Sequence, residues 1–161
     1  MEWGLDHIRS RSSQLPDEGV ICGLRFQPAT LWNMTEIRTR PATPGDRPFL
    51  LAMLVAAADW KGQLLLTPAQ VEADPALAHY ITGWQRPSDF GIVATNEAGE
   101  PIGAAWARSF TADDPGYGFI AEDVPEISMA VVTALRGHGV GTRLLAALLR
   151  EARERTTRRS A

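Results

Sequence analysis

The most constraining feature of the sequence is a glycine-rich turn that joins an apolar run to a leucine-rich segment. Residues 127–132 read Ile-Ser-Met-Ala-Val-Val, which is typical of a β-strand, whereas the leucines that follow the turn recur at helical spacing. Gly137, Gly139 and Gly141 occupy alternate positions between the two. Glycines permit a tight turn there and leave successive N–H groups uncovered at the positive end of the helix dipole. The segment therefore predicts a strand, a turn that can bind a phosphate or pyrophosphate, and a helix.

Two common phosphate-binding motifs do not fit this turn. A P-loop has Lys followed by Ser or Thr after its last glycine, but Gly141 is followed by Thr142 and Arg143. A dinucleotide fingerprint has a third glycine three residues after the second, but Leu144 stands three residues after Gly141. The spacing therefore disfavours both a P-loop and a dinucleotide-binding turn.

The pattern that remains, Arg-x-x-Gly-x-Gly after a strand, resembles the acyl-CoA-binding signature of the GNAT-type N-acetyltransferases. Arg136, Gly139 and Gly141 match the signature, and residues 126–145 resemble the fourth strand and third helix of that family. Thr133 departs from it, since many members carry proline there. The resemblance implies an α/β fold with a mixed sheet flanked by helices. It also implies transfer of an acetyl group from acetyl-CoA, as co-substrate, to a primary amine of a small molecule or peptide.

The same resemblance implies which residues bind acetyl-CoA. The pyrophosphate would lie on the turn, formed by Arg136, Gly137, His138, Gly139, Val140, Gly141 and Thr142. The pantetheine arm would pair like an additional strand with the backbone of Met129, Ala130 and Val131, where an N–H group can also stabilise the oxyanion. The side chain of Arg136 either adds charge or points to solvent, and His138 is expected to face solvent.

A base is needed because amines are mostly charged near neutral pH. The predicted base is Glu126, which opens the strand where family members often place this residue; Glu122 and Asp123 are the alternatives. These acids can instead be solvated, or attract a cationic acceptor without contacting its proton. The single cysteine, Cys22, lies outside the resembling segment, so direct attack by the amine is predicted.

Residues 35–79 predict one strand and two helices. The strand is expected over 35–40, followed by a buried helix over 49–58 with Asp46 as its N-cap. A second helix is expected from Thr67 towards residue 79, and Pro75 should kink or divide it.

Residues 90–95 and 101–108 predict two strands joined as a β-hairpin, because Asn and Gly lie between them. Three aromatic residues of the preceding region either line the acceptor site as an aromatic wall or pack against the sheet: Trp60, Tyr80 and Trp84.

Two parts of the chain are expected from this pattern. Residues 1–33 carry several helix breakers and one potential short strand at 20–26, so they predict a poorly ordered extension. Residues 34–161 form the GNAT-like domain, in which the family's last strands and helix have no counterpart. Residues 127–132 would then be an exposed edge strand. Either the chain is a truncated product with weak or absent activity, or a second copy, a partner chain or residues 20–26 covers this edge. The alternative function is a non-catalytic acyl-CoA-binding or protein-interaction module.

Composition restricts the class of protein. The chain has 161 residues, 45% of them hydrophobic and 22% charged, which suits one globular domain. No apolar run approaches a membrane span and no signal peptide is evident, so we expect a cytoplasmic protein without a membrane partner. Because the chain has one cysteine and no Cys/His cluster, we expect no internal disulfide and no metal site. A net charge of -3 disfavours nucleic acid, and the dominance of arginine over lysine indicates a high-GC bacterial source.

Overall fold

The structure, a computed structural model, describes residues 20–21, 24–25 and 36–159. Its main element is a four-stranded sheet in the order β3-β4-β5-β6. The strands are β3 (Arg38–Pro41), β4 (Phe90–Thr95), β5 (Pro101–Arg108) and β6 (Glu126–Val131). The combination of this sheet with flanking helices confirms the predicted α/β fold. The prediction of a mixed sheet is wrong for the described strands, because all three pairings are antiparallel.

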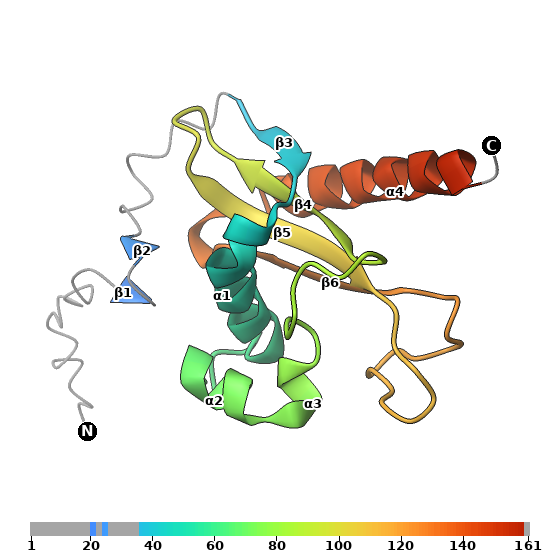
Figure 1. Ribbon diagram of the computed structural model, residues 1–161. Helices are drawn as coiled ribbons and strands as arrows, with labels where there is room; N and C mark the ends of the chain where they lie inside the picture. The colour runs from blue at the N-terminus through green and yellow to red at the C-terminus, as the bar shows by residue number, and fades with distance from the viewer. Residues whose placement is uncertain (1–19, 22–23, 26–35, 160–161) are drawn as a thin grey trace, which may run out of the picture.

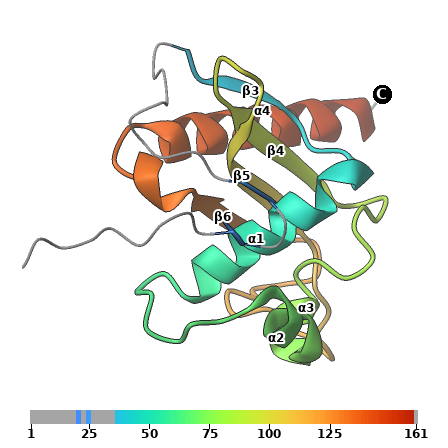
Figure 2. The ribbon, with the colours of Figure 1, turned by 90° about the vertical axis from the view of Figure 1, so that its left-hand side faces the viewer.

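Helices cover both faces of this sheet (Figure 1). One face carries α1 (Arg47–Ala58), with α2 (Pro68–Ala73) and α3 (Pro75–Ala78) beyond it. The other face carries α4 (Val140–Arg159), and Figure 2 shows α1 and α4 on opposite sides of the strands. None of the described helices is long and apolar enough to cross a membrane.

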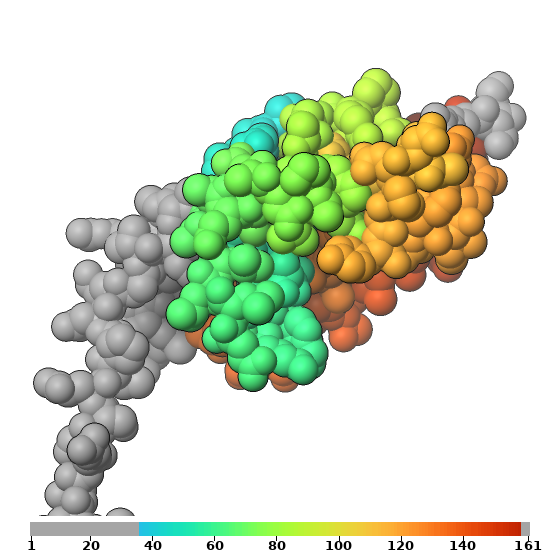
Figure 3. Space-filling view, turned by 90° about the horizontal axis from the view of Figure 1, so that it is seen from below, coloured from blue at the N-terminus to red at the C-terminus, as the bar shows by residue number. Residues whose placement is uncertain are grey.

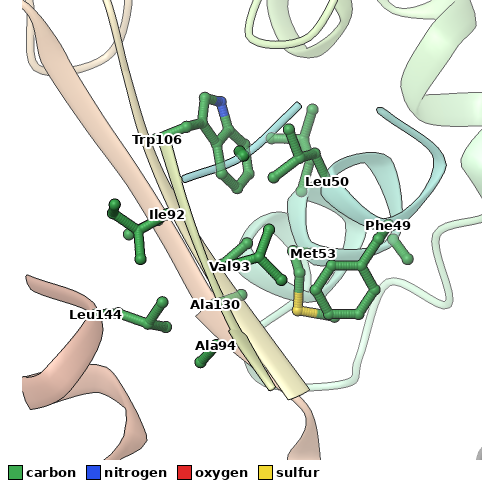
Figure 4. Close-up of a cluster of buried hydrophobic side chains, with 14 of the residues drawn as sticks. Phe49, Leu50, Met53, Ile92, Val93, Ala94, Trp106, Ala130 and Leu144 are labelled. Atoms are coloured by element: carbon green, nitrogen blue, oxygen red, sulfur yellow. The ribbon is translucent and has the colours of Figure 1, made fainter. Parts of the chain in front are cut away.

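Alternate residues of the strands supply the two halves of the core. In Figure 4, Ile92 and Ala94 point towards Leu144 of α4, whereas Val93 and Trp106 point towards α1. The side chains of Val93, Trp106 and Leu144 are fully buried. Helix α1 is apolar around most of its circumference, and residues 49–55 of it are all buried, as predicted.

Most of the element predictions are confirmed, and their boundaries are adjusted. The hairpin of β4 and β5 has the predicted bounds, and the second helix divides at Asp74 into α2 and α3. Thr67 accepts a hydrogen bond from the backbone N–H of Gln70, as an N-cap does. The first strand begins at Arg38, later than residue 35. In the N-terminal extension, the single strand expected over 20–26 is wrong, because Val20–Ile21 (β1) and Leu24–Arg25 (β2) pair antiparallel as two short strands. The rest of the extension, with Cys22, lies outside the described residues.

Asp46 occupies the N-cap position of α1, but its carboxylate does not cap that helix. It accepts from the backbone N–H and hydroxyl of Thr43, at 2.7 and 2.9 Å, and pairs with the guanidinium of Arg40 at 2.7 Å. The carboxylate thus closes the 3-10 turn Pro44–Asp46 that precedes α1, because Arg40 at the end of β3 and the N–H of Thr43 bind it instead. The hydrogen bond from Arg40 holds the pKa of Asp46 at about 2, below its usual value of 3.8.

We expect this carboxylate to make stability depend on acid pH. Its folded pKa is depressed, so its contribution is complete above about pH 4 and is lost as the pH falls towards 2. Because Arg40 is 45% exposed and solvent weakens the pair, the contribution is about 1 kcal/mol. Urea unfolding of the wild type and of Asp46→Asn at pH 5 and pH 2.5 measures it. The wild type should lose more stability than the variant over this interval, and equal losses would contradict the assignment.

Candidate functional site

The glycine-rich turn lies between β6 and α4, as predicted. A 3-10 turn over Thr133–Leu135 follows β6, and α4 begins at Val140. Gly137 and Gly139 have φ angles of 78° and 82°. These angles lie in the left-handed region that side chains disfavour, so the turn requires glycine at both positions. The residues of the turn, 136–139, are all exposed.

The start of α4 leaves its first backbone donors without acceptors inside the helix. The first bond of the helix runs from the N–H of Arg143 to the carbonyl of Gly139, at 3.2 Å. The N–H groups of Val140, Gly141 and Thr142 therefore have no acceptor within the helix. Val140 anchors this end with a buried side chain, whereas Thr142 is exposed. Donors at the positive end of a 20-residue helix suit an anion such as a pyrophosphate.

Two side chains of the turn are placed by the structure. The Nε of Arg136 donates to the carbonyl of Val131 at 3.3 Å, so this side chain folds back towards β6 while the residue stays exposed. The Nδ1 of His138 lies 3.0 Å from the carbonyl of Arg136, and the His138 residue is exposed, as expected. Arg136 thus brings positive charge between the turn and the edge of β6.

β6 is the edge strand of the described sheet, as predicted, and pairs only with β5. The N–H of Val132 donates to the carbonyl of Ile102 at 3.0 Å, so alternate residues before it point their backbone groups towards β5. Ala130 is among these residues, whereas the backbone groups of Met129 and Val131 point away from the sheet. The side chains of Met129 and Val131 pack beneath the start of α4, 3.8 and 4.0 Å from where a Cβ on Gly141 would lie. The free edge therefore leads directly into the turn.

Glu126, the predicted base, opens β6 and is half-buried on the face that carries α1. Its Oε1 accepts a hydrogen bond from the hydroxyl of Tyr80 at 2.7 Å, and its Oε2 accepts one from the N–H of Gly118 at 3.0 Å. In Figure 3 the loop that leads into β6 (orange) lies against the segment around α3 (green), which brings these groups together. The carboxylate is thus held between two segments that are distant in the sequence.

The other acids of the loop point elsewhere. Glu122 accepts from the N–H of Ala112 at 3.2 Å, and Asp123 lines a cavity between the end of α4 and the sheet. Asp114 lies 2.8 Å from the Nδ1 of His79. Within the part of the chain that the structure describes, no three His, Cys, Asp or Glu side chains gather as metal ligands, and the absence of a metal stays a prediction.

The three aromatic candidates do not form one wall. Trp60 is 67% exposed, whereas Trp84 is buried and donates from Nε1 to the carbonyl of Thr43 at 3.0 Å. Only Tyr80 reaches the site, and it does so through its hydroxyl group. Sequence reasoning missed this role, as well as that of Gly118. The one available signal was the Gly-Tyr-Gly sequence at 116–118, which precedes the predicted strand.

Comparison with known proteins supplies a family and a fold. The model of the acetyltransferase (GNAT) family matches residues 55–161, and no curated protein matches the chain significantly. An N-acetyltransferase structure from Ralstonia eutropha has 20% identity and a TM-score of 0.54, over 75% of this chain and 78% of that one. A GNAT-family acetyltransferase from Staphylococcus aureus has 11% identity and a TM-score of 0.52, over 75% and 68%. An acetyltransferase related to histone acetyltransferases, from Corynebacterium glutamicum, has 21% identity and a TM-score of 0.52, over 73% and 72%.

Proposed function

The chain belongs to the acetyltransferase (GNAT) family, and we propose that it transfers an acetyl group from acetyl-CoA to a primary amine. The observation that carries the proposal is the continuity of the free edge of β6 with the exposed glycine turn at the start of α4. A strand edge suits an arm that contains amides, and a helix N-terminus suits a pyrophosphate. Acetyl-CoA combines both groups in one molecule.

In this proposal the turn holds the pyrophosphate. The N–H groups from Gly137 to Thr142 supply donors at the helix N-terminus, and Arg136 supplies a positive charge nearby. The backbone N–H and carbonyl of Met129 and the N–H of Val131, which point away from β5, hold the pantetheine arm in the manner of an additional strand. The N–H of Met129 is the candidate donor to the oxyanion, because it points away from the sheet.

The acceptor then reacts by direct attack. Glu126 removes a proton from the ammonium group, directly or through a water, and the free amine attacks the thioester carbon. The C–S bond breaks as the amide forms, and CoA leaves as the thiol when its sulfur takes up the second proton that the attacking nitrogen releases. With a rise of about 3.3 Å per residue, Glu126 lies about 10 Å along β6 from Met129, which leaves room for the thioester and the amine. The acceptor is a small-molecule or peptide amine in this proposal.

Ligand binding tests the proposal. We expect acetyl-CoA at about 100 times its Kd to stabilise the folded chain by about 2.7 kcal/mol, while ATP and NAD give no stabilisation. Thermal unfolding with each ligand measures this difference. Protection by ATP or NAD without protection by acetyl-CoA would refute the proposal and favour a nucleotide-binding protein.

A variant of the turn sharpens this test. We expect Gly139→Ala to weaken acetyl-CoA binding by about 5–10-fold, because alanine is strained at a φ of 82° and relief of the strain reorients the N–H groups. Gly99→Ala is the matched control, since Gly99 has a φ of 81°, lies in the β4–β5 turn and likewise has open space around it. Both variants should lose similar stability, but only Gly139→Ala should lose affinity by calorimetry. Equal affinities would argue against the turn as the binding site.

A second candidate function is a non-catalytic acyl-CoA-binding or protein-interaction module. Ile127 and Met129 favour it, because they are 43% and 39% exposed along the edge of β6 that no other described strand pairs with. Such an edge suits pairing with a second copy or a partner chain. A module would bind acetyl-CoA or a partner without acetyl transfer, so measured transfer that depends on Glu126 would exclude it.

A further inference from the structure

The carboxylate of Glu126 lies in a site that the rest of the chain builds around it. Gly116 shows this most directly, because a Cβ on that residue would collide with Oε2 of Glu126 and would lie 3.0 Å from the ring of Phe110. A Cβ on Gly118 would lie 3.3 Å from the carboxyl carbon. The two glycines therefore leave the space that the carboxylate fills, and the N–H of Gly118 binds one of its oxygens.

Tyr80 supplies the side-chain hydrogen bond to this carboxylate, and its direction follows from the contacts. The N–H of Tyr117 donates to the hydroxyl oxygen of Tyr80 at 2.7 Å, so the hydroxyl hydrogen is directed to Oε1 of Glu126. Burial raises the pKa of Tyr80 to about 12, and the phenol therefore keeps its proton at neutral pH. Tyr80 is thus a permanent donor to Glu126.

The position of Tyr80 is fixed from the sheet. The Nε1 of Trp106 donates to the carbonyl of Tyr80 at 3.0 Å, and the guanidinium of Arg108 donates to the carbonyls of His79 and Thr82 at 2.7 Å each. Tyr80 is 5% exposed, and its ring lies edge-on to that of Phe110, with a centroid distance of 5.0 Å. These contacts leave the hydroxyl little freedom to move, so it can act as a fixed reference point for another side chain.

We propose that Tyr80 is a positioning residue, which holds the carboxylate of Glu126 in a single orientation and fastens the loop at Tyr117 and Gly118 beside it. The catalytic part of this inference rests on the proposed function, in which Glu126 accepts the proton of the amine. With one oxygen bound to Tyr80 and the other to Gly118, the carboxylate keeps further lone pairs for the amine or a bridging water. Fixing the base in this way removes the need to order it during the reaction.

Kinetics test the catalytic part of the inference. We expect Tyr80→Phe to lower kcat about 10-fold with no change in the KM for acetyl-CoA, since it removes one hydrogen bond to a charged group and keeps the ring. Thr82→Val is the matched control. It deletes a hydroxyl from the same turn, and this hydroxyl donates to the carbonyl of Ala78 and not to Glu126. In a Glu126→Gln background, Tyr80→Phe should have no further effect. Multiplied effects of the two substitutions would overturn the positioning role.

A second measurement does not depend on activity. The amide of Gly118 bonds to Glu126 and not to Tyr80, so its hydrogen exchange reports whether the carboxylate stays in place. We expect faster exchange at Gly118 in Tyr80→Phe and unchanged exchange in Thr82→Val, measured by NMR. Unchanged exchange at Gly118 in Tyr80→Phe would overturn the inference. If exchange responds as expected but Glu126→Gln keeps full transfer, the proposed base is wrong while the contact between Tyr80 and Glu126 stands.

Discussion

Replacing Glu126 with glutamine is expected to lower the rate of acetyl transfer by about 10²–10⁴-fold, the usual contribution of a positioned base. Glutamine has nearly the same shape but cannot accept the proton of an ammonium group. The terminal nitrogen of glutamine is a donor and not an acceptor, so glutamine cannot accept on two atoms from Tyr80 and Gly118 as the carboxylate does. The affinity for acetyl-CoA should stay unchanged, because the turn and the edge of β6 bind that molecule.

The measurement combines steady-state transfer with calorimetry of acetyl-CoA binding. Glu122→Gln and Asp123→Asn serve as controls, because they remove the alternative carboxylates of the same loop, which point elsewhere. We expect both controls to transfer at nearly the wild-type rate. If either of them loses activity as strongly as Glu126→Gln should, the base is that residue and the assignment to Glu126 is wrong. If Glu126→Gln loses affinity for acetyl-CoA as well, its effect on binding accounts for part of the lost rate.

Sequence predicted the strand, turn and helix around residues 126–159 because their signals are local. A run of β-branched residues, glycines at alternate positions and leucines at helical spacing each report on a few neighbouring residues. The φ angles of Gly137 and Gly139 confirm that glycine is required in the turn. The position of Glu126 at the start of β6 followed from the same local pattern.

The surroundings of Glu126 could not be predicted in this way. Tyr80 lies 46 residues before Glu126, and their contact depends on how the segment after α3 packs on β5. That packing is set by Arg108 and Trp106, whose side chains bind backbone carbonyls that no sequence pattern identifies. Asp46 illustrates the same limit, because the local capping signal was correct in position but Arg40 and Thr43 bind its carboxylate. Contacts between distant segments therefore decide the details of the site.

Replacing Arg108 with methionine is expected to destabilise the fold by about 3–5 kcal/mol, the usual effect of breaking a buried ion pair. The side chains of Arg108 and Asp89 are 1% and 0% exposed, and the closest pair of their atoms is 2.6 Å apart. The variant would leave the carboxylate of Asp89 buried with Arg86 as its remaining charged partner among the described residues. It would also leave the carbonyls of His79 and Thr82 without the hydrogen bonds that Arg108 donates.

Urea unfolding followed by circular dichroism measures this loss, and Arg38→Met is the control. Arg38 forms an exposed pair with Glu36 at 2.9 Å, so its replacement should change stability very little. Arg108→Lys should fall between the two, because lysine keeps the charge but lacks the planar fork that reaches Asp89 and both carbonyls. Since domains of this size are stable by about 5–15 kcal/mol, Arg108→Met should remain folded only over a narrow range of urea. A midpoint close to that of the wild type would show that water replaces the lost bonds, and Arg108 would then not fix the segment that carries Tyr80.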